Sequence, residues 1–492
     1  MREDKFNLCQ ILFNNKTSPE KTAIIYNYDN ISYRELKNKI CQYGTFFMKM
    51  HIRPNDTVAI YIEDSPESIY CFWGSILIGA HPVILNKKLE WSEVARICAG
   101  INVNVLIIDT DDNFTLPYTI SIRNIKDALG ESNYTMHLTA ADKEIFTIFT
   151  SGSTGTPKRI EHSYADVVHC IESYGKKVLG ITENDIFYSQ SKLAFVFGLV
   201  STLFLPFAVG ATAILNHKDD IQEIGKISCQ YRPTLFFAVP IIYKMLLKME
   251  KTNSDNFSSV RAFVSSGETL PSSIIDMWAC RYNKMIIQGY GSTETLYIVI
   301  SNDINNVKRG SSGKLLDGYQ AKICDFNGNE VVPANKVGEL YLSGGSIAKF
   351  SQNANEAQEA SKAIWWKTGD LFKVDDEGFY WYVGRIKDNF KINGAWLDDY
   401  KISNIIEENI KILESVVSGE ISNNDTTKIV AYIVAKQKIE EEDIKNIRFT
   451  IIKKLGRQYV PQKFYLVENI PKGITGKVNR SKLNEIKIEK VY

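Results

Sequence analysis

The chain has 492 residues, with 58 basic and 57 acidic side chains and a formal net charge of +1. This length predicts two or more domains and a large apolar core. The balanced charge argues against general nucleic-acid binding, which needs a basic excess. Its eight scattered cysteines have neither metal-ligand spacing nor the density of a disulfide scaffold, and its six histidines form no HExxH pattern. Because "MREDKFNLCQ" contains no apolar signal core, we expect a cytoplasmic protein.

Two long apolar stretches share one pattern. Residues 69–85, "IYCFWGSILIGAHPVIL", predict a helix, a stop at Gly79, and a short strand. Residues 195–215, "FVFGLVSTLFLPFAVGATAIL", carry no charge over 21 residues and are long enough to span a bilayer. Gly210 interrupts that stretch before "TAIL", as a helix stop before a strand would. The repetition favours α/β units over membrane spans.

Other segments agree with α/β construction in chain order. Short β-branched runs alternate with helical stretches before Gly310, and such runs suit parallel strands covered on both faces. They are "NVLIID", "TLFFAVP", "RAFVSSG" and "KMIIQGYG". Shorter strands and turns follow Gly310, in "YQAKICDFNGNEVV", "GELYLSG" and "GFYWYVG". From about Arg385, "LDDYKISNIIEENIKI" predicts an amphipathic helix, followed by "KIVAYIVA", another helix and a Lys-rich end. We therefore expect a large α/β domain, a β-rich part and a small α+β C-terminal domain.

A loop rich in hydroxyl groups directly follows the strand-like run "EIFTIF". Gly152 and Gly155 allow backbone N–H groups to turn toward an anion, and Lys158 adds a positive charge. Four hydroxyl donors complete the loop: Ser151, Ser153, Thr154 and Thr156. Pro157 stands before the lysine, so this is not the Walker pattern. A generic Ser/Gly loop is more often a solvated turn, but the string "TSGSTGTPK" after an apolar strand favours phosphate binding.

Five motifs in this order resemble the acyl-adenylate-forming (AMP-binding) superfamily over nearly the whole chain. They are "TSGSTGTPK" (150–158), "QGYGSTET" (288–295), "WKTGD" (366–370), "GRIKDNFKINGAW" (384–396) and "PKGITGKVNR" (471–480). The resemblance implies a ligase that uses ATP and Mg²⁺ to activate a carboxylic acid and passes the acyl group to a thiol. It also implies an α/β fold in which residues 1–386 form a large N-terminal domain of two α/β subdomains plus a β-rich subdomain. Residues 387–492 would form a small mobile α+β C-terminal domain, hinged at Lys387.

The resemblance also implies roles for individual residues. The catalytic residues would be Thr293, Glu294 and Lys477, with Glu294 also holding the metal. Nucleotide binding would use Thr150, Ser151, Gly152, Ser153, Thr154, Gly155, Lys158, Gly267, Glu268, Gly289, Tyr290, Gly291, Ser292, Asp370 and Arg385.

The chemistry accounts for these residue types. Joining a carboxylate to ATP brings an anion against a polyanion, so the site must screen charge. A carboxylate such as Glu294 among phosphate-binding hydroxyls needs a bridging Mg²⁺, whereas a structural role would be helix capping. Asp370 at a turn can accept both ribose hydroxyls, or it is an ordinary turn residue. Arg385 could reach the ribose or a phosphate, and Tyr290 could stack on adenine or belong to the core. Lys477 would bridge the carboxylate and the α-phosphate as a compact ammonium; otherwise it is a surface lysine.

The substrate segment favours an aryl acid. "KLAFVFGL" (192–199) resembles the Lys-Leu-x-Phe-x-Tyr-Gly-Leu pattern of benzoate-CoA ligases. Val196 stands where amino-acid-activating domains carry Asp, so an ammonium would be buried there without a partner. The expected apolar pocket consists of Phe195, Val196, Phe197, Ala238, Ser266, Gly267, Gly289, Tyr297 and Ile298. A small aryl carboxylate such as a benzoate fits best, and a short or medium fatty acid is second. Tyr297 stands where benzoate-type enzymes often have His, so it is a candidate contact for a ring hydroxyl.

Two departures from the family pattern leave the thiol acceptor open. Arg159 follows Lys158 where glycine is usual, and could crowd the loop or contact a phosphate. Lys401 replaces the last acid of the hinge-helix string. CoA and the phosphopantetheine of an acyl or aryl carrier protein both remain candidates. A catalytically inactive adenylate-binding protein is the remaining alternative, although Glu294, Asp370 and Lys477 are all present.

Overall fold

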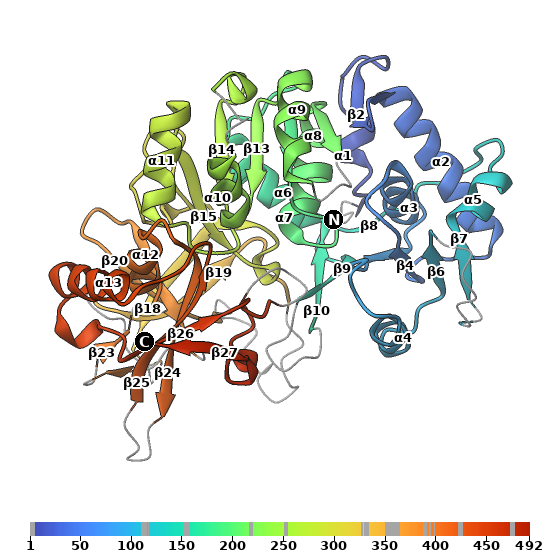
Figure 1. Ribbon diagram of the computed structural model, residues 1–492. Helices are drawn as coiled ribbons and strands as arrows, with labels where there is room; N and C mark the ends of the chain where they lie inside the picture. Colours follow the sequence, from blue (N-terminus) through green and yellow to red (C-terminus); the bar gives the residue numbers. More distant parts are fainter. Residues whose placement is uncertain are drawn as a thin grey trace.

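The computed structural model describes residues 5–492 with gaps at 110–115, 117, 151–157, 216–219, 250–253, 326–327, 329–333, 350–364, 387–390, 393–394, 398, 422–426 and 473–477. Figure 1 shows two α/β layers built from the first 300 residues, followed by an antiparallel sheet and a C-terminal α+β part. This arrangement confirms the predicted α/β class.

The first large sheet has six strands in the order β10-β9-β5-β4-β6-β7. The pairs between β9 and β7 are parallel, and only the edge strand β10 runs antiparallel. Its strands are β4 (Thr57–Tyr61), β5 (His81–Ile84), β6 (Val105–Ile108), β7 (Thr119–Ser121), β9 (Glu144–Thr150) and β10 (Lys158–Ser163). On β4, Val58 and Ile60 join one hydrophobic cluster, while Ala59 and Tyr61 join another. Burial on both faces explains the uninterrupted apolar runs.

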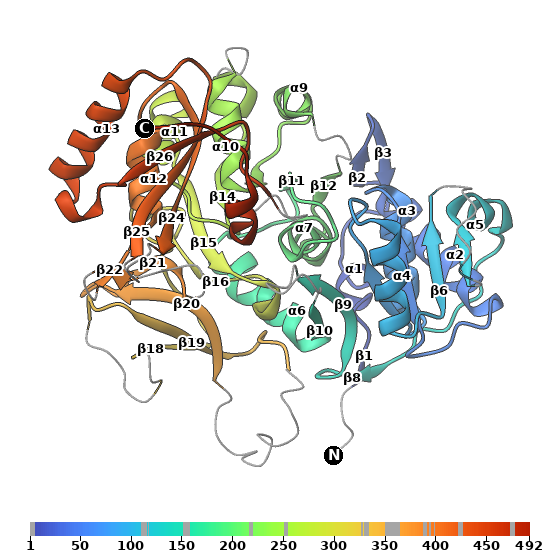
Figure 2. The same cartoon turned by 60° about the horizontal axis from the view of Figure 1, so that its bottom comes forward.

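Helices cover both faces of this sheet. The inner face packs against α3 (Pro66–Leu77) and, beyond it, α2 (Tyr33–Lys49), and the outer face packs against α4 (Trp91–Gly100). Short elements complete this region: β1 (Lys5–Phe6), α1 (Gln10–Phe13), α5 (Ile122–Ala128) and β8 (Thr139–Ala140). Figure 2 shows α2, α3 and α4 around the strands of this sheet.

The second large sheet has nine strands in the order β17-β16-β15-β14-β13-β11-β12-β2-β3. The six central strands, from β15 to β2, are parallel, and their neighbours on both sides run antiparallel. The strands are β2 (Thr22–Tyr26), β3 (Asp29–Ser32), β11 (Ile186–Ser189), β12 (Thr212–Leu215), β13 (Leu235–Ala238), β14 (Ala262–Ser265), β15 (Ile286–Gly291), β16 (Ile298–Ser301) and β17 (Lys314–Leu315). On β13, Leu235 and Phe237 face the central cluster, whereas Phe236 and Ala238 face the outer one.

Further helices pack on this sheet. The outer cluster includes side chains of α9 (Ile221–Tyr231), α10 (Pro240–Lys248) and α11 (Ser272–Tyr282). The central cluster includes side chains of α6 (Tyr164–Cys170) and of the π-helix η1 (Ile171–Lys176). A short 3-10 helix, η3 (Ser254–Phe257), lies between α10 and β14 in the chain.

Both long apolar stretches fold as helix, glycine turn and strand. The first forms α3, Gly79 with φ +79°, and β5. The second forms α7 (Val196–Leu199), the π-helix η2 (Val200–Phe204), α8 (Leu205–Val209), Gly210 with φ +71°, and β12. Glycine suits both turns because a Cβ is unfavourable at positive φ. Within the described ranges, no helix combines the length and apolarity needed to cross a bilayer.

A four-stranded antiparallel sheet follows, in the order β18-β19-β20-β21. Its strands are β18 (Tyr319–Cys324), β19 (Gly338–Gly344), β20 (Trp366–Val374) and β21 (Tyr380–Arg385). Its inner side chains, including Leu340, Leu342 and Phe372, join the central hydrophobic cluster. The strands predicted after Gly310 are therefore confirmed.

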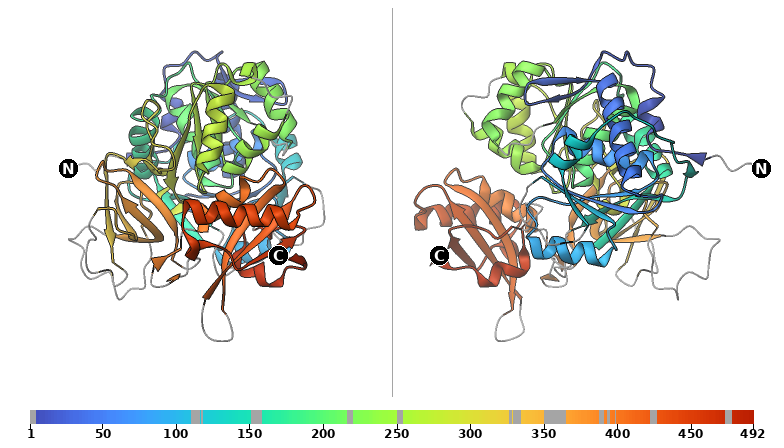
Figure 3. Two further views of the ribbon diagram at one scale, coloured as in Figure 1. Left: turned by 60° about the vertical axis from the view of Figure 1, so that its left-hand side comes forward. Right: turned by 90° about the vertical axis from the view of Figure 1, so that its right-hand side faces the viewer.

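The C-terminal part has hydrophobic clusters of its own. A mixed sheet in the order β24-β25-β26-β27 packs against two helices, and both of its clusters draw only on residues after 396. Its elements are α12 (Asp399–Glu407), β24 (Ile412–Ile421), β25 (Thr427–Ala435), α13 (Glu441–Lys454), η5 (Arg457–Tyr459), β26 (Lys463–Val467), η6 (Arg480–Glu485) and β27 (Ile488–Val491). A short hairpin of β22 (Lys391–Ile392) and β23 (Ala395–Trp396) precedes them. Figure 3 shows this part as a lobe beside the rest of the chain.

Candidate active site

One group of the predicted site residues lies at one edge of the second large sheet. Ala238 ends β13, Ser266 and Gly267 follow β14, and Gly289–Gly291 close β15. The carboxyl ends of parallel strands meet at one edge, and ligands of open α/β sheets bind there. The packing of β13, β14 and β15 therefore brings three separate sequence segments to one place.

Two glycines of the "GYG" string allow a close backbone approach. A Cβ on Gly291 would lie 2.1 Å from the Tyr297 carbonyl oxygen, and a Cβ on Gly289 would lie 2.7 Å from Cγ2 of Ile298. Any larger residue would push the strand end away from the turn that follows it. These glycines therefore serve packing at the site.

A carboxylate cluster joins the second large sheet to the antiparallel sheet. Asp370 and Arg385 are register partners on β20 and β21, and Nε of Arg385 lies 3.3 Å from Oδ1 of Asp370. The Tyr290 hydroxyl donates to Oδ2 of Asp370 at 2.7 Å. Burial, followed by the Asp370 charge, raises the pKa of the Tyr290 phenol, which therefore stays protonated and donates. The Tyr290 ring packs edge-on against Phe372, with centroids 4.8 Å apart.

The two residues that flank the predicted phosphate loop are paired, and Lys158 lies near Glu294. Thr150 ends β9 and Lys158 begins β10, and the two residues are register partners. Nζ of Lys158 lies 4.0 Å from Oε1 of Glu294. The loop residues Ser151–Gly155, together with Lys387 and Lys477, fall outside the described residues. Arg159 instead donates to Oε1 of Glu161 at 2.6 Å, so its guanidinium is committed to a neighbour on its own strand.

The turn that carries Glu294 is held at several points. Thr293–Thr295 form the 3-10 helix η4, and Leu296 after it adopts φ +63°. Positive φ is unfavourable for leucine and persists where the surroundings enforce it. The Ala348 N–H donates to the Glu294 carbonyl at 2.8 Å, and the Ser346 hydroxyl donates to the Thr295 carbonyl at 2.7 Å. Sequence reasoning missed these supports, because nothing in the local pattern points to them.

Residues predicted to line the substrate pocket pack as an aromatic cluster. The rings of Phe197 and Tyr297 stack at 5.7 Å, and Tyr174 meets Tyr297 edge-on at 5.4 Å. Phe237 packs against Phe197 at 6.1 Å. Neither Tyr174 nor Phe237 was predicted from the sequence, since neither belongs to a motif. Of the predicted set, Ile298 is buried in the same central cluster as Phe197 and Tyr297. Ser266 is also buried, Ala238 is buried in the outer cluster, and Phe195 and Val196 are half-buried.

Tyr297 is a neutral polar group in this apolar setting. Burial raises the pKa of its phenol, so the hydroxyl stays protonated. Within the described chain this hydroxyl makes no hydrogen bond of normal geometry, and Ser201 is the polar side chain beside it. The Ser201 hydroxyl itself donates to the Phe197 carbonyl at 2.5 Å. The Tyr297 hydroxyl therefore has capacity to bind a polar ring substituent.

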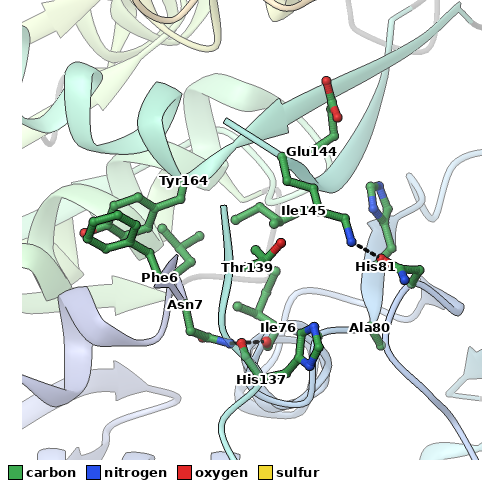
Figure 4. A pocket seen from close by; sticks show the side chains of 14 residues that line it. Phe6, Asn7, Ile76, Ala80, His81, His137, Thr139, Glu144, Ile145 and Tyr164 are labelled. Atoms are coloured by element: carbon green, nitrogen blue, oxygen red, sulfur yellow. Dashed lines mark hydrogen bonds between the residues drawn. The ribbon is translucent and has the colours of Figure 1, made fainter. Parts of the chain in front are cut away.

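A separate cavity lies under the first sheet, away from these residues. Figure 4 shows that Phe6, Asn7, His81, His137 and Tyr164 line it. Its free volume of about 20 Å³ is room for one or two water molecules. It is too small for an aryl acid, and no predicted site residue lines it.

The donor set suits a magnesium ion bound together with a nucleotide. Over the described ranges, no group of three or more His, Cys, Asp or Glu side chains could hold a metal by itself. Mg²⁺ is commonly bound by one or two carboxylates plus substrate phosphates, so Glu294 beside Lys158 fits such a site.

A model of the AMP-binding enzyme family matches residues 13–350. The chain belongs to this family. It is 29% identical over 485 residues to a benzoate–CoA ligase of Thauera aromatica. The aligned region covers 94% of this chain and 92% of that protein. It is 26% identical over 491 residues to a 4-hydroxybenzoate–CoA/benzoate–CoA ligase of Rhodopseudomonas palustris, covering 95% and 91%.

The fold of this family member also matches a solved structure. A crystal structure of an anthranilate CoA ligase in complex with anthranoyl-AMP superimposes with a TM-score of 0.90 and 27% identity. The superposition covers 98% of this chain and 97% of that one. The similarity thus includes the C-terminal part, beyond the residues matched by the family model.

Proposed function

We propose that this enzyme activates a small aryl carboxylic acid with ATP and transfers the acyl group to CoA. The observation that carries the proposal is the aromatic cluster of Phe197 and Tyr297, which follows the Glu294 turn in the chain, together with the Tyr290–Asp370 hydrogen bond. The relatives with the same full-length architecture are named as ligases of benzoate, hydroxybenzoate and anthranilate. Aromatic side chains favour packing against a planar ring, and Val196 offers no partner for an α-ammonium.

The proposed first step joins two anions. A carboxylate oxygen attacks the α-phosphorus of ATP, the bond to the β-phosphate breaks, and pyrophosphate leaves. Lys158 and the phosphate loop would hold the phosphates, and Asp370, oriented by Tyr290 and Arg385, would accept the ribose hydroxyls. Mg²⁺ held at Glu294 would supply charge neutralisation of the phosphates. Lys477 would contact the carboxylate and the α-phosphate.

The proposed second step needs a different arrangement. The thiol sulfur attacks the acyl carbon, the thiol proton is lost, and AMP leaves with the former mixed-anhydride oxygen. We propose that the chain divides into domains 1–386 and 387–492 and that the second rotates about Lys387 between the steps. The separate hydrophobic clusters of the C-terminal part support this division, because that part keeps its own core when it moves.

A carboxylate-dependent ATP–pyrophosphate exchange assay tests the proposal. The panel should contain benzoate, hydroxybenzoates, anthranilate, medium-chain fatty acids and phenylalanine. We expect exchange with aryl acids and at most weak exchange with phenylalanine. Adding CoA, and separately a phosphopantetheinylated carrier protein, identifies the thiol acceptor. Absence of exchange with every acid would refute the ligase assignment, and preference for phenylalanine would refute the pocket assignment.

A further inference from the structure

One face of β10 points at the Glu294 turn. Side chains alternate along a strand, so Lys158, Ile160 and His162 share a face opposite to Arg159 and Glu161. His162 is fully buried, with 0% of its surface exposed. Its Nε2 lies 2.7 Å from the Thr293 carbonyl oxygen. Because a carbonyl oxygen can only accept, Nε2 carries the proton and donates.

The other ring nitrogen of His162 also has a neighbour that restrains the ring. Its Nδ1 lies 3.3 Å from Oδ2 of Asp166, and that same oxygen accepts the Ser163 N–H at 2.8 Å. Ser163 in turn caps α6 by accepting the Asp166 N–H. The Asp166 carboxylate beside Nδ1 and the Thr293 carbonyl at Nε2 confine the ring from two sides. The ring therefore presents its Nε2 proton to Thr293 in one orientation.

The His162–Thr293 hydrogen bond is one of three that hold successive carbonyl groups of the Glu294 turn. The successive carbonyls of Thr293, Glu294 and Thr295 accept hydrogen bonds from His162, Ala348 and Ser346, in that order. Only the His162 donor comes from the strand that begins with Lys158, at the end of the phosphate loop. His162 thus joins that strand directly to the turn bearing Glu294, which ends in the strained residue Leu296.

We propose that His162 is a positioning residue that sets the Glu294 turn at the correct distance from the phosphate loop for MgATP. The inference rests on the proposed function, in which Glu294 holds Mg²⁺ against the phosphates. Loss of the Nε2 donor leaves the Thr293 carbonyl bonded to the Leu296 N–H within the same turn, at 3.1 Å. The turn then loses this tie to β10, and Glu294 moves with the turn. The affinity for MgATP then falls, while the affinity for metal-free ATP stays the same, because Glu294 acts through the metal.

Three substitutions at His162 separate the loss of the hydrogen-bond donor from a change in side-chain shape. His162→Phe keeps an aromatic ring of similar size without a donor. His162→Gln places an amide N–H near the position of Nε2, and His162→Asn carries the same amide one methylene short. The matched control is His81→Phe, which removes another histidine of the same sheet (Figure 4). Nε2 of His81 lies 2.8 Å from the Thr147 hydroxyl.

The readout is the ratio of ATP dissociation constants without and with Mg²⁺, measured by titration calorimetry on the purified full-length protein. Loss of a neutral hydrogen bond predicts about a three- to tenfold smaller ratio for His162→Phe and His162→Asn. His162→Gln should recover most of the wild-type ratio, and His81→Phe should keep it while losing thermal stability. Pyrophosphate exchange should show the same order in KM for MgATP, with the KM for the carboxylic acid unchanged.

An unchanged ratio in His162→Asn would overturn the proposal, as would equal loss of ATP affinity with and without Mg²⁺. If His162→Phe does not fold, the Gln and Asn pair decides, since the two differ only in reach. The outcomes also separate this inference from the proposed function. If Mg²⁺-dependent ATP binding by the wild type and the variants follows these predictions but the wild type activates no acid, the positioning role of His162 is supported and the ligase assignment is refuted.

Discussion

Replacing Glu407 by Gln removes the charge partner of Lys244 where α12 of the C-terminal part meets α10. Nζ of Lys244 donates to Oε2 of Glu407 at 2.6 Å, and the two side chains are only 17% and 18% exposed. Exposed ion pairs contribute up to about 1 kcal/mol, and breaking a buried pair costs about 3–5 kcal/mol. This pair lies between those limits, so its loss should cost about 1–3 kcal/mol, a factor of about 5–150 in the docking equilibrium.

The substitution is specific to the contact between the two parts. The other carboxylate oxygen of Glu407 accepts the Ser415 N–H at 2.7 Å, and the Gln carbonyl can keep that bond. Glu408→Gln is the matched control, because Glu408 pairs with Lys454 at 2.6 Å inside the C-terminal part and both are well exposed. We expect the control to change docking by less than about 1 kcal/mol.

Fluorescence energy transfer measures the docked fraction. One dye can be attached to the exposed Cys280 of α11 and the other to a cysteine introduced at Lys453 of α13, after Cys229→Ser removes the second exposed thiol. Glu407→Gln should lower the docked fraction, and added salt should bring the wild type toward the variant. The rates of adenylation and thioester formation should change unequally. Equal energy transfer and equal rates in Glu407→Gln and Glu408→Gln would refute the reasoning.

The same contact predicts a pH dependence. Burial, with Lys244 and Lys436 next, lowers the pKa of Lys248 to about 8 from its usual 10.5. Lys436 belongs to the C-terminal part, so its effect on the pKa of Lys248 is lost in the proposed separation of the two parts. The docked state therefore binds fewer protons than the separated state within this pH range. Docking is penalised in full below pH 8 and strengthens as the pH rises through this window. Lys248→Met should remove that dependence, and an unchanged slope would contradict it.

Three further outcomes test the site and the fold. Lys477→Ala should slow adenylation by about 10²–10³-fold while ATP still binds, and a rate within about threefold of wild type would exclude a catalytic role. Lys387→Pro fixes φ near −65° and should preserve adenylation while abolishing thioester formation, so unimpaired thioester formation would contradict the hinge. Burial lowers the pKa of His81 to about 4, so the free energy of unfolding should fall as the pH drops from 6.5 to 4. His81→Gln should flatten that pH profile, as measured by chemical denaturation.

Local sequence was enough to locate most strands and the glycine turns. Strands such as β6, β13 and β14 are buried on both faces, and a strand of that kind must be an unbroken apolar run whatever surrounds it. Gly79 and Gly210 mark helix ends because few other residues tolerate positive φ. The same reasoning extends to the motif strings, whose residue types follow from the chemistry of binding a polyanion.

Partners distant in the sequence were decided by the tertiary structure. Tyr290 and Asp370 are 80 residues apart, His162 and Thr293 are 131 apart, and Lys244 and Glu407 are 163 apart. No periodicity or spacing relates such residues, because their distance depends on how separate sheets and helices pack. The sequence by itself therefore determined which elements form, and its motifs predict which residues bind a nucleotide. Only the packing of those elements decided that Tyr290 supports Asp370, that His162 supports the Glu294 turn, and that Glu407 meets Lys244.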